Sequence, residues 1–192
     1  MNNQFSYPKF LNEPAVLVAK KLLGCILERE INGHKIKVRI VETEAYDQND
    51  PASHAFGGKT PRNSVMFGES GHLYVYFTYG MHYCCNVVTG AQGYGSGVLI
   101  RAVEPIEGEI YIEKRRGIRG INTTNGPAKL CKALDIDFRL RGHDLRNPPL
   151  KLLSSELNAD EDIVQTTRIG ISKAKDLKRR FYIKNNPYVS KY

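Results

Sequence analysis

The feature that most constrains this chain is the alternation of apolar and charged residues along 35–46. Strand side chains alternate between two faces, and one face of the first half carries Ile36, Val38 and Ile40. If the strand continues without a break, the same face next carries Glu42, Glu44 and Tyr46. A carboxylate on an apolar face is costly unless it is hydrogen-bonded, paired or used in chemistry. The pattern predicts a core-facing strand whose glutamates are either satisfied by arginines and backbone amides or functional.

Two hairpins are predicted around this strand. Asn32-Gly33 joins residues 25–31 to the strand, because Asn-Gly favours a two-residue hairpin turn. A second hairpin combines the β-forming residues 72–79 and 82–88, with Tyr79 at or near its tip.

The remaining elements complete an α+β pattern. Further strands are predicted at 98–104, 167–171 and 180–184, and helices at 13–25, 107–116 and 127–134. Residues 47–64 form a long turn-rich loop, of a length that is usually functional or disordered. We expect a single domain over 1–192, with a curved, mostly antiparallel β-sheet, surrounding helices and a protruding β-hairpin.

Composition narrows the class of partner. Lysine and arginine exceed the acidic residues by 28 − 20 = 8, and the pI is near 9.3. An anionic partner is therefore expected, nucleic acid above all. The apolar runs are too short to span a bilayer, and Met1 to Phe10 lack the pattern of a signal peptide. We expect a cytoplasmic protein in a bacterium, with the nucleoid, or a nuclear one in a eukaryote.

Cysteine and histidine spacing gives no sign of a metal site. The cysteines show no C-x-x-C pattern, so buried free thiols are expected at Cys25, Cys84, Cys85 and Cys131. The five histidines also lack metal-ligand spacing. No metal or cofactor is expected.

A family resemblance rests on a series of motifs in order along the chain. They are Val41–Tyr46, His54 with Gly57-Gly58, Thr60–Asn63, Leu73–Met81, Cys85-Asn86, Leu99–Pro105, Asn125–Pro127, Arg168–Gly170 and Arg180–Tyr182. With these motifs the chain resembles the alkyladenine (3-methyladenine) DNA glycosylases of the mammalian and bacterial type, over roughly residues 12–190. The resemblance implies removal of alkylated or deaminated purines from double-stranded DNA, by a monomer without a cofactor. The substrate class includes 3-methyladenine, 7-methylguanine, hypoxanthine and ethenoadenine.

The resemblance also assigns roles at the sugar and at the helix. Glu44 activates the attacking water, and Arg101 lies near that water and the carboxylate. Tyr79 is the wedge that fills the stack when the target nucleotide is flipped out. Ile169 matches a backbone position that lines the water pocket.

The flipped base is expected in an aromatic slot. By resemblance, Tyr46 and His54 lie on one side of the base and Tyr76 on the other. Asn86 corresponds to the residue that crowds the exocyclic amino group of normal guanine, and so selects against it.

Other functions remain open from the residues alone. One is a glycosylase-lyase in which a lysine such as Lys59 is the nucleophile. Another is a non-catalytic binder of damaged DNA, which needs Tyr79 and the basic surface but not Glu44. A small-molecule hydrolase using both glutamates would leave Tyr79 and the charge of +8 without a role.

Overall fold

The predicted Asn32-Gly33 hairpin organises the sheet. In the computed structural model, which describes residues 6–191, β1 (Ile26–Ile31) pairs antiparallel with β2 (His34–Asp47). Asn32 and Gly33 have φ values of 50° and 77°, the left-handed conformation that a type I′ turn requires. Residues 1–5 of the polar N-terminal stretch, and Tyr192, lie outside the described residues.

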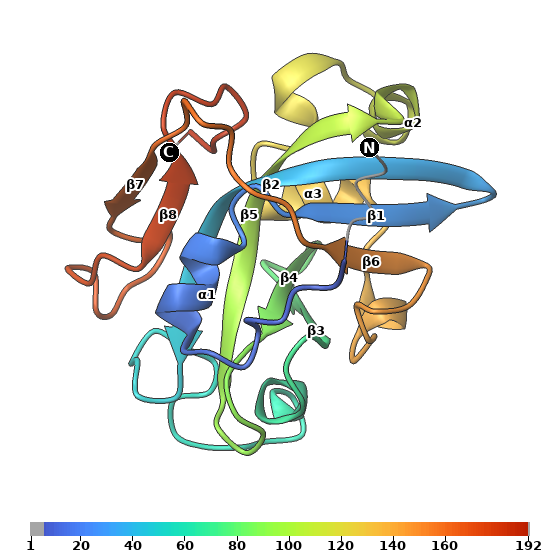
Figure 1. The fold of residues 1–192 in the computed structure, drawn as a ribbon. Coiled ribbons are helices and arrows are strands. Elements are labelled where there is room, and N and C mark those ends of the chain that lie inside the picture. Colours follow the sequence, from blue (N-terminus) through green and yellow to red (C-terminus); the bar gives the residue numbers. More distant parts are fainter. Residues whose placement is uncertain (1–5, 192) are drawn as a thin grey trace.

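The sheet is antiparallel and curls around the core (Figure 1). Its strands run in the order β3-β4-β5-β2-β1-β6, and β8 pairs with both β2 and β7. The further strands are β3 (Leu73–Thr78), β4 (His82–Val88), β5 (Ser96–Glu107), β6 (Leu150–Leu153), β7 (Ile163–Thr166) and β8 (Arg180–Ile183). The long strand β2 pairs with β1, β5 and β8. It therefore links β3, β4 and β5 on one side of the sheet to β1 and β6 on the other.

Three α-helices in residues 6–191 complete the α+β fold. They are α1 (Ala15–Lys21), α2 (Glu109–Arg116) and α3 (Pro127–Ala133), and short 3-10 helices cover Ser64–Phe67, Gly120–Thr123 and Phe138–Leu140. α1 follows Pro14, which suits the start of a helix, and buries Val18 completely. Burial of such a side chain stabilises the fold by about 1.5–3 kcal/mol.

A β-bulge in β2 interrupts the predicted alternation of side chains between the two faces of the strand. Ile40 pairs with Val103 and Glu42 with Ala102, so Val41 is an extra residue in β2. Because side chains alternate with period two, one extra residue exchanges the two faces. The glutamates therefore do not share a face with the upstream apolar residues, as the uninterrupted pattern predicted.

Burial beyond the bulge agrees with this exchange. Val41 and Ala45 join the hydrophobic core that already contains Ile40, and the hydroxyl of Thr43 donates to the carbonyl of Ala19 in α1 at 2.8 Å. The core side of β2 is even-numbered before the bulge and odd-numbered after it, which turns Glu44 away from α1.

The predicted strand at 167–171 is also wrong. The strand in this region is β7, at Ile163–Thr166. Residues 150–165, for which no clear pattern was predicted, contain β6 and the first part of β7, joined by a segment without helix or strand. Gly170 has a φ of 74°, and the amide of Ile169 donates to a side-chain carboxylate. Residues 167–171 therefore form a loop that contributes to a site.

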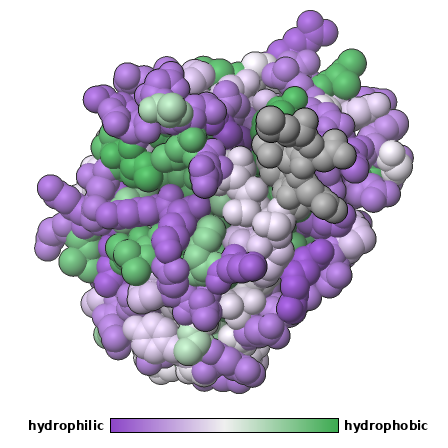
Figure 2. All heavy atoms as spheres, viewed as in Figure 1, coloured by the Kyte–Doolittle hydropathy of each residue, from purple (hydrophilic) through white to green (hydrophobic). Residues whose placement is uncertain are grey.

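The remaining expectations concern cysteines, metals and membranes. All four cysteines are buried and free. Within residues 6–191 there is no cluster of three or more His, Cys, Asp or Glu side chains able to hold a metal ion, and no helix is long and apolar enough to cross a membrane. Hydrophilic residues cover most of the face in Figure 2, with small hydrophobic patches among them.

Candidate active site

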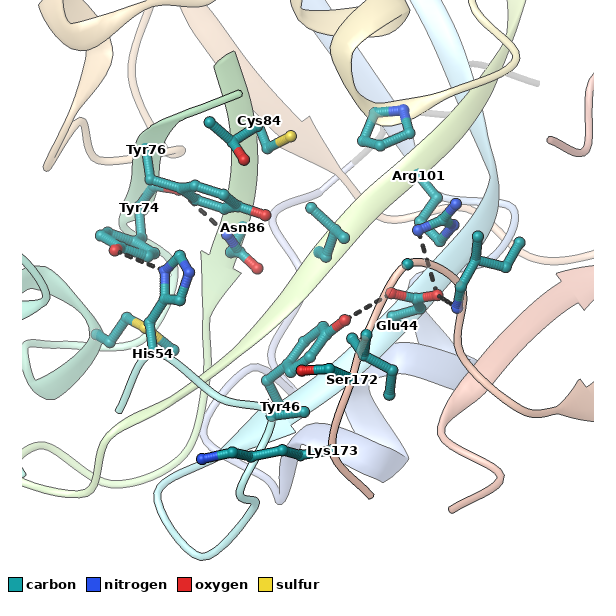
Figure 3. Close-up of a pocket in the computed structure, with 18 of the residues that line it drawn as sticks. Glu44, Tyr46, His54, Tyr74, Tyr76, Cys84, Asn86, Arg101, Ser172 and Lys173 are labelled. Atoms are coloured by element: carbon teal, nitrogen blue, oxygen red, sulfur yellow. Dashed lines mark hydrogen bonds and ion pairs between the residues drawn. The ribbon is translucent and has the colours of Figure 1, made fainter. Parts of the chain in front are cut away.

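All of the predicted site residues line one cavity of about 520 Å³. They come from β2, the loop after it, the β3–β4 hairpin, β5 and the loop after β7: Glu44, Tyr46, His54, Tyr76, Tyr79, Asn86, Arg101 and Ile169. The volume is within the range of small-molecule pockets, roughly 300–1,000 Å³. Figure 3 shows Tyr76 and His54 on one side of this cavity and Tyr46 with Glu44 on the other.

Glu44 is fully buried but borders the cavity. Its Oε1 accepts a hydrogen bond from the Ile169 amide at 2.8 Å and lies 3.2 Å from Nη1 of Arg101. Its Oε2 accepts the hydroxyl of Tyr46 at 2.7 Å. Each carboxylate oxygen can accept two hydrogen bonds, and Oε2 has this single donor in the described chain. One acceptor position on Glu44 therefore remains for a bound molecule.

Glu42 has a different environment, although it is only two residues away. It is fully buried and is not among the residues that line the cavity. Its Oε1 accepts from Nε of Arg180 at 2.6 Å and Nε of Arg101 at 3.0 Å. Ser190 donates its amide to Oε2 at 2.8 Å and its hydroxyl to Oε1 at 2.9 Å. Glu42 therefore has a structural role: it compensates two buried arginines and does not border the cavity.

Arg101 bridges the two glutamates. Its side chain is 8% exposed and contacts Glu42 through Nε and Glu44 through Nη1. Burial lowers the pKa of Arg101, but the adjacent carboxylates of Glu44 and Glu42 outweigh this and raise it. Arg101 is therefore a permanent cation that compensates buried negative charge.

The aromatic wall differs from the predicted slot. The His54 ring lies 4.6 Å from the Tyr76 ring, edge to face at 76°, and its Nδ1 lies 3.0 Å from the Tyr74 hydroxyl. A stacked base needs a gap of roughly 7 Å, twice the usual carbon–carbon contact. No base fits between His54 and Tyr76, so the prediction that they face each other across the base is wrong. The open slot lies between Tyr46 and the Tyr76–His54 pair.

These aromatic groups are uncharged at neutral pH. Burial raises the pKa of Tyr46, and the nearby Glu44 raises it further. Burial likewise raises the pKa of Tyr76. Burial lowers the pKa of His54, and the positive charge of Arg62 adds to that effect. The slot therefore presents neutral rings beside one carboxylate.

Tyr79 stands at the tip of the β3–β4 hairpin. Tyr79 and Gly80 both have positive φ, 50° and 67°, and Tyr79 is 81% exposed. A left-handed conformation is uncommon for a residue other than glycine, so this turn projects a bulky ring at a backbone cost. Tyr79 also borders the cavity, which puts an exposed aromatic ring at the entrance.

Asn86 and Cys84 form part of the inner surface. Both line the cavity from β4, and the Asn86 side-chain amide is 3.5 Å from the Tyr74 carbonyl. Burial raises the pKa of Cys84 to about 11, so it is a thiol at neutral pH. Cys85 points the other way into the core, as expected for neighbours in a strand.

Sequence reasoning missed several residues of the site. Arg168 lies against the ring of Tyr46 and pairs with Asp50, and Lys173 lines the cavity. The Arg168–Gly170 motif pointed to this segment, whereas no local signal marked Asp50. Lys59, the predicted alternative nucleophile, is exposed and is not among the lining residues.

Comparison with known proteins gives the family. The family model for methylpurine-DNA glycosylase (MPG) matches residues 9–187. A protein of Carboxydothermus hydrogenoformans is 57% identical over 185 residues, covering 95% of this chain and 97% of its own length. One from Methanoculleus marisnigri is 49% identical over 191 residues, with 95% and 96% covered. Both carry the name "Putative 3-methyladenine DNA glycosylase".

A third relative, from Francisella tularensis subsp. tularensis, is 50% identical over 177 residues, which cover 90% of this chain and 92% of that protein. The matches span the α+β fold and the whole cavity described above. The chain therefore belongs to the methylpurine-DNA glycosylase family and is a DNA glycosylase of DNA repair.

Proposed function

We propose that this chain is a monofunctional glycosylase that hydrolyses the N-glycosidic bond of damaged purines flipped out of double-stranded DNA. The substrates are alkylated or deaminated purines such as 3-methyladenine, 7-methylguanine, hypoxanthine and ethenoadenine. The observation that carries the proposal is Glu44: a buried carboxylate with an open acceptor position, beside an aromatic cavity of about 520 Å³.

The proposed reaction uses water as the nucleophile. A water molecule bound to Oε2 of Glu44 attacks C1′ of the deoxyribose, and its proton passes to the carboxylate. The bond between C1′ and the purine nitrogen breaks, and its electron pair leaves with the base. The products are the free base and a sugar with a 1′-hydroxyl. The proton taken up by Glu44 passes to solvent when a cationic purine leaves as a neutral base, and to the departing base when the purine was neutral. Positive charge builds on the sugar during cleavage, so a nearby carboxylate stabilises the transition state.

The partners of Glu44 prepare it for this step. The Ile169 amide, Arg101 and the Tyr46 hydroxyl hold both oxygens in place, and such preorganisation avoids rearrangement during the reaction. Arg101 contacts Oε1, so one acceptor position on Oε2 is left for the water. This geometry supports Glu44 as the base and Arg101 as its positioning partner.

Base capture is proposed to use the aromatic rings. The flipped purine stacks between Tyr46 and the Tyr76–His54 pair, where a cationic alkylated base gains a cation–π attraction. Asn86 on the inner surface excludes the exocyclic amino group of guanine. Tyr79 enters the duplex and replaces the lost stacking, since inserted side chains are a known device for distorting DNA.

A direct assay tests the function. Duplex DNA carrying one lesion is incubated with the protein without added metal, and released base is measured for the wild type and Glu44→Gln. We expect release by the wild type only, with similar DNA affinity for both. Equal release by the two proteins would remove Glu44 from the mechanism, and no release from any lesion would overturn the proposal.

A second candidate is a glycosylase-lyase with Lys173 as nucleophile. Lys173 lines the cavity, whereas the previously considered Lys59 does not. A lyase forms a covalent imine between its amine and C1′, which borohydride reduces to a stable adduct. Trapping that is lost in Lys173→Ala would favour this candidate, and the absence of an adduct would favour hydrolysis.

We further propose that the protein acts as a monomer in the compartment that holds the chromosome. That compartment is the cytoplasm of a bacterium, with the nucleoid, or the nucleus of a eukaryote. One chain contains the complete cavity and the exposed Tyr79, which supports a monomer. A sedimentation equilibrium measurement of mass, with and without DNA, tests this.

A further inference from the structure

The rear of the base slot contains an arginine that the proposed chemistry does not use. Arg168 lies with its Cζ 4.6 Å from the centre of the Tyr46 ring. Tyr46 borders the cavity, whereas Arg168 is not among the lining residues. The guanidinium therefore covers the face of the ring that a stacked base would not occupy.

Arg168 is fixed by a buried ion pair. The side chains of Arg168 and Asp50 are both fully buried. Nη2 of Arg168 donates to Oδ1 of Asp50 at 3.0 Å, and Nη1 makes a second contact to Oδ2. Nη1 also donates to the carbonyl of Ala45 at 3.0 Å. These bonds leave the guanidinium plane no freedom to rotate away from Tyr46.

Stability alone does not explain this arrangement. A buried ion pair often contributes little net stability, because both ions lose their hydration. Nε of Arg168 is buried and has no hydrogen-bond partner in residues 6–191, which adds to the cost. A costly group beside an active site suggests a functional reason for its presence.

The pair also joins segments that build the site. Arg168 precedes Ile169, whose amide holds Glu44. Asp50 begins the turn that leads to His54, since its carbonyl accepts from the amide of Ser53 at 2.8 Å. The ion pair thus connects the loop after β7 to the loop after β2.

We propose that Arg168, held by Asp50, is a positioning residue that orders the Tyr46 ring as the fixed wall of the base slot. The inference rests on the proposed function and adds a residue to it. An ordered ring needs no further ordering when the base stacks, which favours binding. A displaced ring would misplace the sugar relative to Glu44, and small misplacements reduce rates strongly.

The test compares Arg168→Lys in two backgrounds. Lysine keeps the positive charge, but it loses the planar contact with the Tyr46 ring and cannot form the paired hydrogen bonds that the guanidinium makes to Asp50. Single-turnover base release and the ratio of affinities for lesion and undamaged duplexes are measured in wild type and in Tyr46→Ala. We expect Arg168→Lys to lower base release and the affinity ratio by roughly tenfold or more in the otherwise wild-type protein. In the Tyr46→Ala background we expect it to lower them by less than about twofold.

Arg39→Lys is the matched control. Arg39 is also a largely buried arginine, 14% exposed, and it pairs with two carboxylates, Glu104 and Glu161, away from the cavity. We expect this variant to change release and affinity ratio by less than about twofold. If Arg168→Lys does not fold, Asp50→Asn replaces it, with the same expectation.

The outcomes separate the two proposals. Equal losses in both backgrounds, or an equal loss in Arg39→Lys, would show that Arg168 does not act through Tyr46 and would overturn this inference. In that case wild-type release would still support the proposed function. No wild-type release from any lesion would instead overturn the proposed function.

Discussion

The two ends of the cavity differ in how firmly they are held. At one end Glu44 is fully buried and receives contacts from Ile169, Arg101 and Tyr46. At the other end Tyr79 is 81% exposed, and Met81, which follows it in the same hairpin turn, is 70% exposed. Groups that stabilise a transition state work best when preorganised, whereas a ring that enters DNA must face solvent until DNA arrives. In the proposed function, the carboxylate end performs the chemistry and the hairpin end captures the DNA.

The two glutamates of β2 sharpen this comparison at a smaller scale. Glu42 accepts hydrogen bonds from Arg101, Arg180 and Ser190 and has no access to the cavity. Glu44 keeps an open acceptor position beside the cavity. Under the proposed function, the same side chain on one strand has a structural or a chemical role according to whether it borders the cavity.

The largest expected effect is on chemistry at the carboxylate end. We expect Glu44→Gln to lower base release by roughly 10²–10⁴-fold, the usual contribution of a general base. DNA affinity should change little, because capture depends on the hairpin end. Single-turnover release and a binding titration measure the two quantities separately. A parallel loss of affinity would contradict the division of roles.

The second-largest expected effect is on the stability of the fold around Glu42. Glu42→Gln removes the negative charge that compensates Arg101 and Arg180. Leaving buried charges uncompensated costs about 3–5 kcal/mol, so we expect a clearly lower free energy of unfolding in a denaturant titration. Glu44→Gln is the comparison variant. A smaller loss for Glu42→Gln than for Glu44→Gln would show that the two roles are reversed.

A smaller effect is expected at the hairpin tip. Tyr79→Ala removes the ring that fills the vacated stack, and stacking of one base on an aromatic ring contributes about 1–3 kcal/mol. We expect release from a lesion in duplex DNA to fall roughly 5- to 150-fold, with little change in protein stability. Tyr111→Ala is the control, because Tyr111 is an exposed tyrosine that stacks on His34 and does not line the cavity. Equal losses would argue against a wedge.

The smallest expected effect is a pH dependence at the aromatic wall. Burial, with a further contribution from Arg62, lowers the pKa of His54, below the value near 6.5 of an unfolded histidine. Between these two values the unfolded chain binds more protons, so the free energy of unfolding falls as pH drops through this window. Titration of the His54 ring by NMR should give a midpoint below 6.5.

His54→Gln provides the thermodynamic check of the same effect. We expect its stability to depend less on pH between 7 and 5 than that of the wild type, measured by denaturant unfolding. The groups around His54 include the hydroxyl of Tyr74 at 3.0 Å and the cation of Arg62. An ordinary or raised midpoint, or an unchanged pH profile in the variant, would contradict the lowered pKa of His54.

Local sequence was sufficient for the two hairpins. The Asn32-Gly33 turn, the β3–β4 hairpin and the exposure of Tyr79 follow from turn chemistry and strand propensity, which act over a few residues. The family resemblance then identified Glu44 and Arg101 as neighbours, and the structure brings them to 3.2 Å. What local rules could not give is which face each residue occupies.

The sequence by itself determined the residue types and the two hairpins. Tertiary structure alone decided the bulge at Val41, the position of His54 beside Tyr76, and the ion pair of Arg168 with Asp50. The physical reason is the distance along the chain between the residues that interact. A turn or a period-two pattern is encoded in neighbouring residues, whereas a bulge needs its partner strand and a buried ion pair joins residues more than a hundred positions apart.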